Sequence, residues 1–317
     1  MEYTTDMRTP RYAQERARVL VEALPWLKEA SGKTVVIKYG GAAMVDAELK
    51  RQVMDDLVLL KLLGIRPVLV HGGGKAVSRA MEAAGLPVEF KDGMRVTSPK
   101  AMDVVREVLG GSVNSGLVSA VNVHGALAVG LSGMDANTVM AEQISSDLGR
   151  VGRVTQVNAD YLTRLIEADY IPVLSSIATD GRGGCLNVNA DVVAGEVASA
   201  VGAHKLVYIT DVDGIYEDFS DKTTLIARLT DGEAERLMEA GDLSEGMIPK
   251  VSSMVKAIRS GVPRAHIVNG TRPHSVLLEM LTDEGIGTMM TPEHDYGPER
   301  VDDSAAQIGA LAEHLNF

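Results

Sequence analysis

The sequence contains a single cysteine, Cys185, among its 317 residues. One cysteine cannot form an intrachain disulfide, and it excludes metal sites built from several thiolates, as is typical of a reducing compartment. We therefore expect Cys185 to be chemically inert. The sequence also lacks an apolar signal core and any run of the roughly 20 apolar residues that a bilayer-spanning helix needs. These absences predict a cytoplasmic protein with no membrane partner.

The sequence contains fewer basic residues than acidic ones. Lys and Arg total 31 against 43 Asp and Glu, which gives a formal net charge of −12. Binding to nucleic acid needs a basic face, and the Lys and Arg residues do not gather into one, so we expect no nucleic acid partner. A hydrophobic content of 45% supports a large core and excludes a disordered or fibrous chain. An enzyme that acts on a small molecule fits this composition best.

Short apolar runs rich in β-branched residues alternate with helical patterns. Strands are predicted at 34–38, 67–71, 126–131, 171–177, 205–210 and 265–268. Strands that alternate with helices form a mainly parallel sheet that is covered on both faces. The sequence thus predicts an α/β fold, a three-layer αβα sandwich with a mainly parallel central sheet. Two glycine-containing segments, 139–158 and 181–189, are predicted as β-hairpins outside this pattern.

We expect two lobes preceded by an N-terminal helix. The predicted segments are 1–30, 31–203 and 204–317. The boundary near residue 203 follows Gly202, where a predicted helix over 191–202 ends and a new strand begins. The polar tail 294–317, which contains a short predicted helix, receives no function.

The N-terminal segment 11–30 predicts an amphipathic helix with Val19, Leu20, Leu24 and Leu27 on one face. Helices that lie on a membrane surface have a more basic polar face than this one. We therefore expect its apolar face to pack on a partner subunit.

Glycine-rich turns follow the first two predicted strands. Lys38 precedes Gly40 and Gly41 in the first turn, and His71 precedes the glycines 72–74 in the second. Ligands bind at the carboxyl ends of parallel strands, and glycines there allow backbone N–H groups to approach phosphate oxygens. Either turn alone could simply end a strand. Together they predict a polyphosphate ligand.

Three familiar nucleotide signatures are missing. The triplet 32–34, GKT, resembles the end of a P-loop, but Leu27 occupies the position of its first glycine and the triplet precedes its strand. The run 72–77 lacks the last glycine of the dinucleotide fingerprint, which weakens a nicotinamide oxidoreductase as an alternative. The catalytic loop of protein kinases is also absent.

Three later motifs complete the set. They are NVNAD at 187–191, TDVDGIY at 210–216 and GMIPK at 246–250. Each has an ordinary structural interpretation, respectively a helix cap, a strand end and a surface lysine. In order with the glycine turns, however, they resemble the amino acid kinase family, and within it the members that phosphorylate N-acetyl-L-glutamate. The resemblance covers roughly residues 18 to 291.

The resemblance implies that the first lobe binds N-acetyl-L-glutamate and that the second binds ATP, with Mg²⁺ bridging the phosphates and no metal site of protein side chains alone. It implies that Lys38 and Lys250 flank the transferred phosphoryl group and that Asp191 positions both lysines. The implied substrate contacts are Gly73, Gly74, Arg95, Asn187 and Asn189. The implied nucleotide contacts are Gly40, Gly41, Thr210, Asp211 and Tyr216.

The chemistry of this reaction agrees with the residues that are present and with those that are not. The acceptor is a carboxylate, which is already ionised at neutral pH because its ordinary pKa is about 4.3. No general base or Ser/Cys nucleophile is needed, and the matched segments contain only cations and N–H donors for the phosphoryl charge. Arg95 suits the substrate's carboxylate because its guanidinium can bind both oxygens.

Arginine-sensitive members of the family carry an N-terminal helix that joins dimers into a hexamer. They also have a pattern similar to His266, Glu279 and the turn that contains Gly287. Trp26 could stack on a guanidinium group. The resemblance therefore implies a homohexamer that L-arginine inhibits in a feedback loop of arginine biosynthesis. The alternatives are that Glu279 lies on a helix surface and that Trp26 is a packing residue.

Some positions depart from the family pattern, and some alternatives stay open. Lys75, Ser115 and Glu245 replace residues usual in the family, and a carboxylate at 245 would repel phosphate nearby. Related kinases act on N-acetyl-aminoadipate, aspartate, carbamate or nucleoside monophosphates, and the choice of chain length depends on pocket size. A non-catalytic arginine-sensing module is the alternative from another class, although Lys38, Asp191 and Lys250 argue against it.

Overall fold

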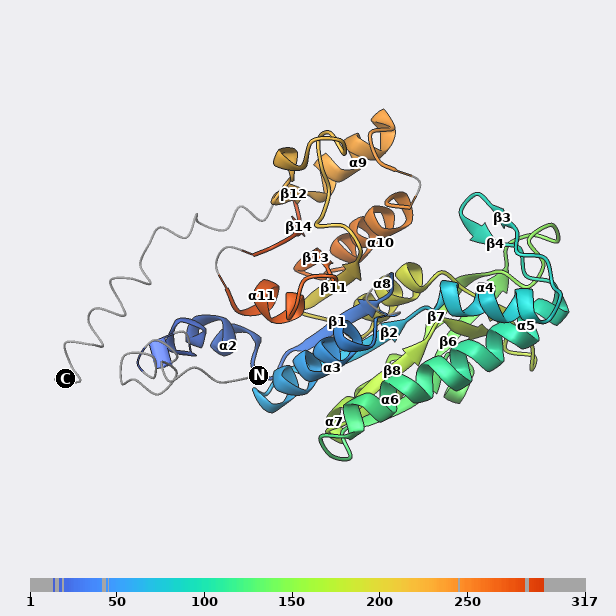
Figure 1. Cartoon of the computed structure of the whole chain (residues 1–317), viewed down its shortest axis with the longest axis horizontal. Coiled ribbons are helices and arrows are strands. Elements are labelled where there is room, and N and C mark those ends of the chain that lie inside the picture. The colour runs from blue at the N-terminus through green and yellow to red at the C-terminus, as the bar shows by residue number, and fades with distance from the viewer. Residues whose placement is uncertain are drawn as a thin grey trace, which may run out of the picture.

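The computed structural model describes residues 14, 17–18, 20–41, 44, 46–244, 246–282 and 285–293. Its main element is an eight-stranded sheet with the order β12-β14-β13-β11-β1-β2-β8-β5 (Figure 1). The strands are β1 (Thr34–Tyr39), β2 (Arg66–His71), β5 (Ala128–Ser132), β8 (Ile171–Ser175), β11 (Lys205–Thr210), β12 (Arg228–Thr230), β13 (Arg264–Asn269) and β14 (Thr288–Thr291). All neighbours in this sheet are parallel except β13 and β14.

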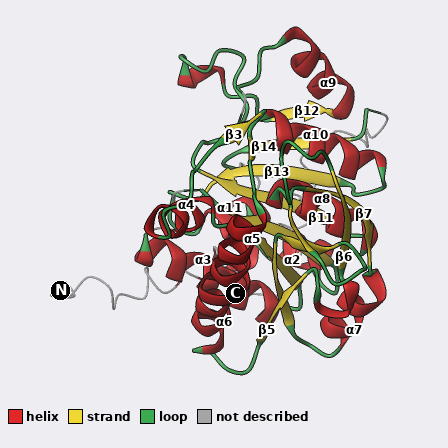
Figure 2. Ribbon diagram, turned by 90° about the vertical axis from the view of Figure 1, so that its right-hand side faces the viewer, coloured by secondary structure: helices red, strands yellow, loops and turns green. Residues whose placement is uncertain are grey.

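Helices cover both faces of this sheet (Figure 2). One face packs against α3 (Ala47–Leu62), α6 (Asn114–Asn122) and α11 (Ser275–Leu281). The other packs against α7 (Ala159–Glu167), α8 (Ala190–Ala200) and α10 (Ile248–Arg259). Burying apolar side chains on both faces explains why the central strands are continuous runs of apolar residues. The predicted three-layer αβα sandwich is confirmed.

A second sheet of four strands lies beside the first, in the order β10-β9-β6-β7. Its strands are β6 (Val139–Gln143), β7 (Gly152–Val157), β9 (Ile177–Thr179) and β10 (Cys185–Asn187). The antiparallel pairs β6–β7 and β9–β10 confirm the two predicted hairpins. The run 171–177 was wrongly predicted as one strand, because β8 ends at Ser175 and the chain enters the second sheet at Ile177. Cys185 is a half-buried free thiol in this sheet.

The remaining elements connect or flank the strands of the two sheets. They are α2 (Leu24–Ala30), α4 (Gly74–Ala83), β3 (Phe90–Lys91), β4 (Met94–Arg95), α5 (Pro99–Arg106), a π-helical turn (Glu107–Val113) and α9 (Asp231–Ala240), besides two short 3₁₀ turns (Asp135–Asn137 and Lys222–Thr224). Helix α5 begins where the sequence offers a cap, because the Ser98 side chain accepts the Ala101 N–H at 3.2 Å and Pro99 fills the first turn. The π-helical turn continues α5 directly into α6.

Strand β11 lies beyond the predicted lobe boundary at 203, yet it pairs with β1 from Val35↔Lys205 to Tyr39↔Ile209. The two predicted lobes therefore share one sheet, and the division into lobes stays a prediction. Gly202 adopts φ +59, a left-handed conformation that suits glycine after a helix.

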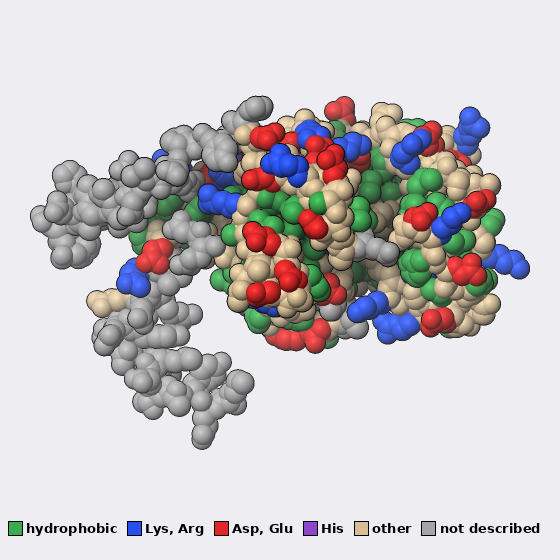
Figure 3. Space-filling view, turned by 90° about the horizontal axis from the view of Figure 1, so that it is seen from above, with side chains coloured by type: hydrophobic (Ala, Val, Ile, Leu, Met, Phe, Trp, Pro, Cys, Tyr) green, Lys and Arg blue, Asp and Glu red, His purple; other side chains and the backbone are tan. Residues whose placement is uncertain are grey.

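The apolar face predicted for the N-terminal helix is exposed. Leu20 is 71% exposed and Leu24 is 56% exposed, so the described residues of this chain do not cover it. Val19 and the tail 294–317, with its predicted helix, lie outside the described residues. Within the described part of the chain, no helix combines the length and the apolar character needed to cross a bilayer. Acidic and basic side chains are interspersed on the face shown in Figure 3.

Candidate active site

The two glycine turns open on one cavity of about 730 Å³ at the carboxyl ends of β1 and β2. Eight of the predicted site residues line this cavity: Lys38, Gly40, Gly41, Gly73, Gly74, Arg95, Asn187 and Asn189. They come from segments more than a hundred residues apart. The parallel sheet brings them together because it places the ends of its strands at one edge.

The ionised side chains that line this cavity are all cationic, although the chain as a whole is acidic. They are Lys38, Lys50, Lys75, Arg79, Arg95 and Arg153. Cations in a partly enclosed space attract anions more strongly than the same charges on an open surface. The cavity therefore suits an anionic ligand.

Lys38 and Lys250 share one buried carboxylate, that of Asp191. The Lys38 ammonium lies 2.9 Å from Asp191 Oδ1, and the Lys250 ammonium lies 3.2 Å from Asp191 Oδ2. Burial disfavours the charged form of Asp191, but the two ammonium groups outweigh burial and hold its pKa below the ordinary value. The Lys250 ammonium also donates to the Gly246 carbonyl at 3.1 Å. The structure therefore places two fixed cations side by side, as the sequence predicted.

Two residues that the sequence analysis missed hold Asp191 in place. The hydroxyl groups of Tyr208 and Ser253 donate to the backbone carbonyl of Asp191 at 3.1 and 2.9 Å. Tyr208 lies in β11 and Ser253 in α10, so these bonds tie the start of α8 to both. Sequence gives no signal for this role, because Tyr208 reads as one more apolar strand residue and Ser253 as a helix residue.

Glycine is required in the first turn for space and for conformation. A Cβ on Gly40 would overlap the Lys38 ammonium. Gly41 adopts φ +73, and a Cβ there would lie 3.5 Å from the backbone nitrogen of Asp211. The first glycine turn is thus in close contact with the end of β11.

Arg95 is buried at the cavity wall and fixed by neutral partners. Its Nη2 donates to the Gly74 carbonyl at 3.0 Å and to the Ser78 hydroxyl at 2.8 Å. Its guanidinium lies over the Phe90 ring, 4.7 Å from the centroid. No carboxylate of the described residues pairs with it, so its charge is available to an anion in the cavity. Ser78 and Phe90 are contacts that the sequence did not indicate.

The two asparagines of the NVNAD motif have different local roles. Asn187 donates through Nδ2 to the Thr97 hydroxyl at 3.2 Å, and Thr97 donates to the Arg95 carbonyl at 2.8 Å. The Asn189 side chain accepts the Asp191 N–H at 2.7 Å and caps α8. The helix cap considered from sequence is therefore present at Asn189, in addition to its place on the cavity wall.

The predicted nucleotide residues of the second lobe lie beside the cavity and do not line it. Thr210 is buried at the end of β11, and Asp211 follows it at the surface. Tyr216 donates its hydroxyl to Asp213 at 3.0 Å, and the Lys222 ammonium lies over its ring. Thr210 and Asp211 adjoin Gly41, whereas the Tyr216 hydroxyl forms its hydrogen bond with Asp213 in the same loop.

His266 and Glu279 form a buried pair at 2.6 Å between His266 Nδ1 and Glu279 Oε1. Glu279 also accepts the Ile286 N–H at 2.8 Å. Burial disfavours the Glu279 carboxylate, but these hydrogen bonds outweigh burial and hold its pKa below the ordinary value. Glu279 is only 8% exposed, so the alternative of a helix-surface residue is wrong. A Cβ on Gly287 would overlap the Ile267 carbonyl, which explains the glycine there.

Trp26, in α2, is half-buried, and the Lys205 ammonium lies 5.7 Å from its ring centroid. Lys205 influences both His266 and Glu279 electrostatically. Lys205, at the start of β11, thus lies between Trp26 and the His266–Glu279 pair, whereas Gly287 lies against Ile267 of β13, and the arginine site itself stays a prediction.

The residues that depart from the family pattern lie in different places. Lys75 is exposed and lines the cavity, and Ser115 is exposed on α6. Glu245 lies outside the described residues. In the described part of the chain, no group of three or more His, Cys, Asp or Glu side chains could hold a metal ion.

Comparison with known proteins agrees with this geometry. A model described as the amino acid kinase family matches residues 33–269. The chain belongs to the amino acid kinase family. This amino acid kinase is 48% identical over 280 residues to the acetylglutamate kinase of Caldanaerobacter subterraneus subsp. tengcongensis, a match that covers 88% of this chain and 94% of that protein.

Solved structures are similar to this chain in fold. N-acetylglutamate synthase from Neisseria gonorrhoeae, complexed with coenzyme A and N-acetyl-glutamate, matches with a TM-score of 0.78 and 27% identity over 94% of this chain and 70% of that one. The same synthase complexed with coenzyme A and L-arginine matches with a TM-score of 0.77 and 25% identity, over the same shares of the two chains.

Proposed function

We propose that this amino acid kinase transfers the γ-phosphoryl group of ATP to the side-chain carboxylate of N-acetyl-L-glutamate, giving N-acetyl-L-glutamyl 5-phosphate in the second step of L-arginine biosynthesis. The observation that carries the proposal is the pair of lysines on one buried carboxylate, beside two glycine turns at the wall of a cationic cavity. The 48% identity with an acetylglutamate kinase supports the choice of substrate.

In the proposed reaction, positively charged groups and N–H donors of the protein stabilise the negative charge on the transferred phosphoryl group. The side-chain oxygen of the acceptor attacks phosphorus without prior deprotonation, because the acceptor is already a carboxylate. Lys38 and Lys250 neutralise the charge that spreads over the phosphoryl oxygens, and N–H groups of the glycine turns donate to the same oxygens. Asp191 keeps the two ammonium groups at fixed positions. Mg²⁺ bound to ATP would add positive charge at the phosphates.

Arg95 gives the cavity its selectivity for an acidic acceptor. A buried guanidinium without a carboxylate partner among the described residues binds the second carboxylate of the substrate through the N–H groups that Gly74 and Ser78 leave free. Asn187, which is linked to Arg95 through Thr97, lies where it can bind the acetamido group. This arrangement favours an acylated dicarboxylic amino acid over carbamate or a nucleoside monophosphate.

The test is to trap the acyl phosphate product as a hydroxamate. Purified protein is incubated with ATP, Mg²⁺, hydroxylamine and one of N-acetyl-L-glutamate, N-acetyl-aminoadipate or aspartate. We expect hydroxamate with N-acetyl-L-glutamate at a rate at least tenfold above that with the others. A higher rate with N-acetyl-aminoadipate would reassign the substrate, and no hydroxamate with any acceptor would favour the non-catalytic arginine sensor.

We also propose that L-arginine inhibits this enzyme at the cluster of Trp26, His266, Glu279 and Gly287. A buried carboxylate that remains ionised can receive a guanidinium group, and a half-buried indole can stack on one. The similarity to a synthase that was solved with L-arginine supports the proposal. Since α2 carries both Trp26 and the exposed Leu24, the same helix would link the inhibitor site to assembly as a hexamer.

The inhibition test compares the enzyme with its Glu279→Gln variant in 0–10 mM L-arginine. We expect inhibition of the unmodified enzyme and at least a tenfold higher half-inhibitory concentration in the variant, because an amide cannot neutralise the guanidinium. Unchanged inhibition in Glu279→Gln would place the arginine site elsewhere.

A further inference from the structure

His71 belongs to the second glycine turn, but it does not line the cavity. Its side chain is 0% exposed at the end of β2, whereas the three glycines that follow it line the cavity wall. A completely buried imidazole beside a ligand-binding turn must satisfy both ring nitrogens within the protein.

The amide of Asn114 determines which ring nitrogen of His71 carries the proton. Asn114 Nδ2 lies 2.8 Å from the Val173 carbonyl and 3.4 Å from the Leu131 carbonyl. Carbonyl oxygens only accept hydrogen bonds, so this atom is the amide nitrogen and not the oxygen. The same nitrogen lies 3.0 Å from His71 Nε2. Nε2 must therefore accept a hydrogen bond and is unprotonated.

The proton of His71 then resides on Nδ1, which lies 2.9 Å from the Gly72 carbonyl and donates to it. Burial lowers the pKa of His71 to about 4, so the ring stays neutral at the pH of the cytoplasm. Gly130 leaves space for this arrangement, because a Cβ there would overlap Asn114 Oδ1. The chain of contacts thus runs from two strand carbonyls through Asn114 and His71 to the turn.

The direction of the Gly72 carbonyl sets the direction of the next N–H group. In a trans peptide, the C=O of one residue and the N–H of the next point in opposite directions. Since the Gly72 carbonyl points toward buried His71, the Gly73 N–H points away from it, on the side of the cavity that Gly73 lines. No hydrogen bond of the described residues uses the Gly73 N–H. Leu109 packs so close to Gly73 that a Cβ there would overlap it.

We propose that His71 is a positioning residue that aims the Gly73 N–H at an anionic oxygen of the ligand in the cavity. Asn114 holds His71 in the Nδ1–H tautomer that this role requires. This inference rests on the proposed function and deepens it. His71 does not touch the ligand and transfers no proton. It holds one peptide plane in the orientation that the developing phosphoryl charge requires.

Two variants separate this role from simple packing. His71→Asn keeps a donor near the position of Nδ1, whereas His71→Gln keeps an acceptor near the position of Nε2 and loses the donor to Gly72. We expect kcat to fall 10- to 100-fold in His71→Gln and less than about fivefold in His71→Asn. Deleting a hydrogen-bond donor to the developing charge typically lowers kcat by about 10²–10³, and a donor that points in the wrong direction should lose part of that effect. Gln is closer to His in volume, so a packing role predicts the reverse order, which would overturn the proposal.

A spectroscopic measurement tests the tautomer without reference to catalysis. The ¹⁵N shifts of His71 in the labelled full chain should show protonated Nδ1 and unprotonated Nε2 from pH 5.5 to 8. A protonated Nε2, or titration of His71 near pH 6.5, would overturn the proposal.

If the enzyme forms no acyl phosphate with any acceptor, the proposed function fails, while calorimetry with Mg–ATP still compares the two His71 variants. Equal affinities of these variants for Mg–ATP would then count against His71, and urea unfolding of each variant controls for loss of fold.

Discussion

At the scale of single residues, the site depends on a charge that burial alone would suppress. Asp191 is only 5% exposed, yet it is ionised because Lys38 and Lys250 lie on its two oxygens. Removing one partner of such a group leaves an uncompensated charge, so each member of the triad depends on the other two.

Replacing either lysine by alanine should reduce kcat by at least 10²–10³, equivalent to about 2.7–4 kcal/mol of transition-state stabilisation. The reason is that the phosphoryl oxygens lose one of two fixed cations. Steady-state assay of hydroxamate formation measures the effect. Lys256→Ala is the matched control, because Lys256 lies on the same helix as Lys250 but is 64% exposed and paired with Glu196. Near-normal turnover in Lys250→Ala or Lys38→Ala would contradict the proposed mechanism.

Arg95→Lys should raise the KM for N-acetyl-L-glutamate by roughly tenfold or more and leave the KM for ATP within about twofold. Lysine retains the charge but cannot bind two carboxylate oxygens in one plane, and one lost charged hydrogen bond corresponds to roughly 1.5–3 kcal/mol. Kinetics with each substrate varied in turn provide the measurement. Arg106→Lys, at an exposed position on α5, is the control. Equal changes in both KM values would argue against a substrate contact at Arg95.

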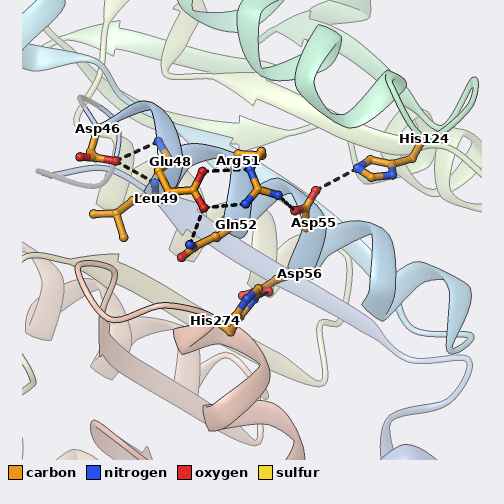
Figure 4. Close-up of polar contacts among 9 residues, drawn as sticks. All are labelled: Asp46, Glu48, Leu49, Arg51, Gln52, Asp55, Asp56, His124 and His274. Atoms are coloured by element: carbon orange, nitrogen blue, oxygen red, sulfur yellow. Dashed lines mark hydrogen bonds and ion pairs between the residues drawn. The ribbon is translucent and has the colours of Figure 1, made fainter. Parts of the chain in front are cut away.

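At the scale of elements, α3 and α11 meet through a buried acid (Figure 4). Asp56 of α3 is 0% exposed, and its Oδ1 lies 2.6 Å from His274 Nδ1 at the start of α11. Burial raises the pKa of Asp56 to about 6, while the hydrogen bond from His274 and the nearby Leu277 N–H oppose the rise and the charge of Asp55 adds to it. This contact links a helix that follows the first glycine turn to the helix that carries Glu279.

A second set of polar contacts lies along α3 in the same view. Arg51 bonds to Glu48 and to Asp55, and Asp55 lies 2.9 Å from His124 Nε2 (Figure 4). Arg51 is 60% exposed in its side chain, and such surface pairs contribute little to stability. The buried Asp56 is therefore the group on α3 whose ionisation matters most.

Asp56→Asn should stabilise the protein above about pH 6. Because the folded-state pKa of Asp56 is raised above the ordinary value of 3.8, the stability that its neutral carboxyl contributes is complete below pH 3.8 and is lost as the pH rises through about 6. Asparagine stays neutral, so the free energy of unfolding in urea should exceed that of the unmodified protein by roughly 1–3 kcal/mol at pH 8. The gain should shrink toward pH 4. Asp103→Asn, which changes an exposed carboxylate on α5, serves as the control, and a loss of stability at pH 8 in Asp56→Asn would refute the account.

At the scale of the whole molecule, one apolar face has no cover within the described chain. Leu24 begins α2 and Leu20 lies four residues before it, and both side chains are exposed. Helix α2 lies at the margin of the structure (Figure 1). Exposed leucines on one face of a helix are typical of an interface between subunits. The proposed hexamer provides that cover, since the helix would pack on the same helix of another copy.

We expect the unmodified chain to sediment as a hexamer and the double variant Leu20→Ser/Leu24→Ser to sediment as a dimer. Polar side chains remove the apolar area that drives association. Analytical ultracentrifugation at micromolar protein measures the change. Phe219→Ser, which removes a 56% exposed apolar side chain from the loop between β11 and β12, should leave the proposed hexamer intact. An unmodified chain that sediments as a monomer would exclude the proposed assembly.

Local sequence patterns were enough to predict the layers of the fold and the two glycine turns. Apolar β-branched runs such as 34–38 and 205–210 predicted their strands because the side chains of a doubly covered sheet must be apolar on both faces. The two glycine turns were also predicted from local sequence, because their glycines directly follow predicted strands. Gly41 adopts a left-handed backbone conformation, which glycine allows and which depends only on that residue and its neighbours.

The contacts between distant segments could be identified only in the tertiary structure. The bonds from Tyr208 and Ser253 to Asp191, and the Asn114–His71 contact, join residues that are 17 to 62 positions apart. The exit of the chain from the main sheet at Ser175 was likewise missed, because the two serines at 175 and 176 do not by themselves distinguish a strand end from a strand that continues to Ile177. Local pattern sets which backbone a segment adopts. Which polar atoms meet depends on how the sheet orders its strands, and that order arises from the packing of the whole molecule.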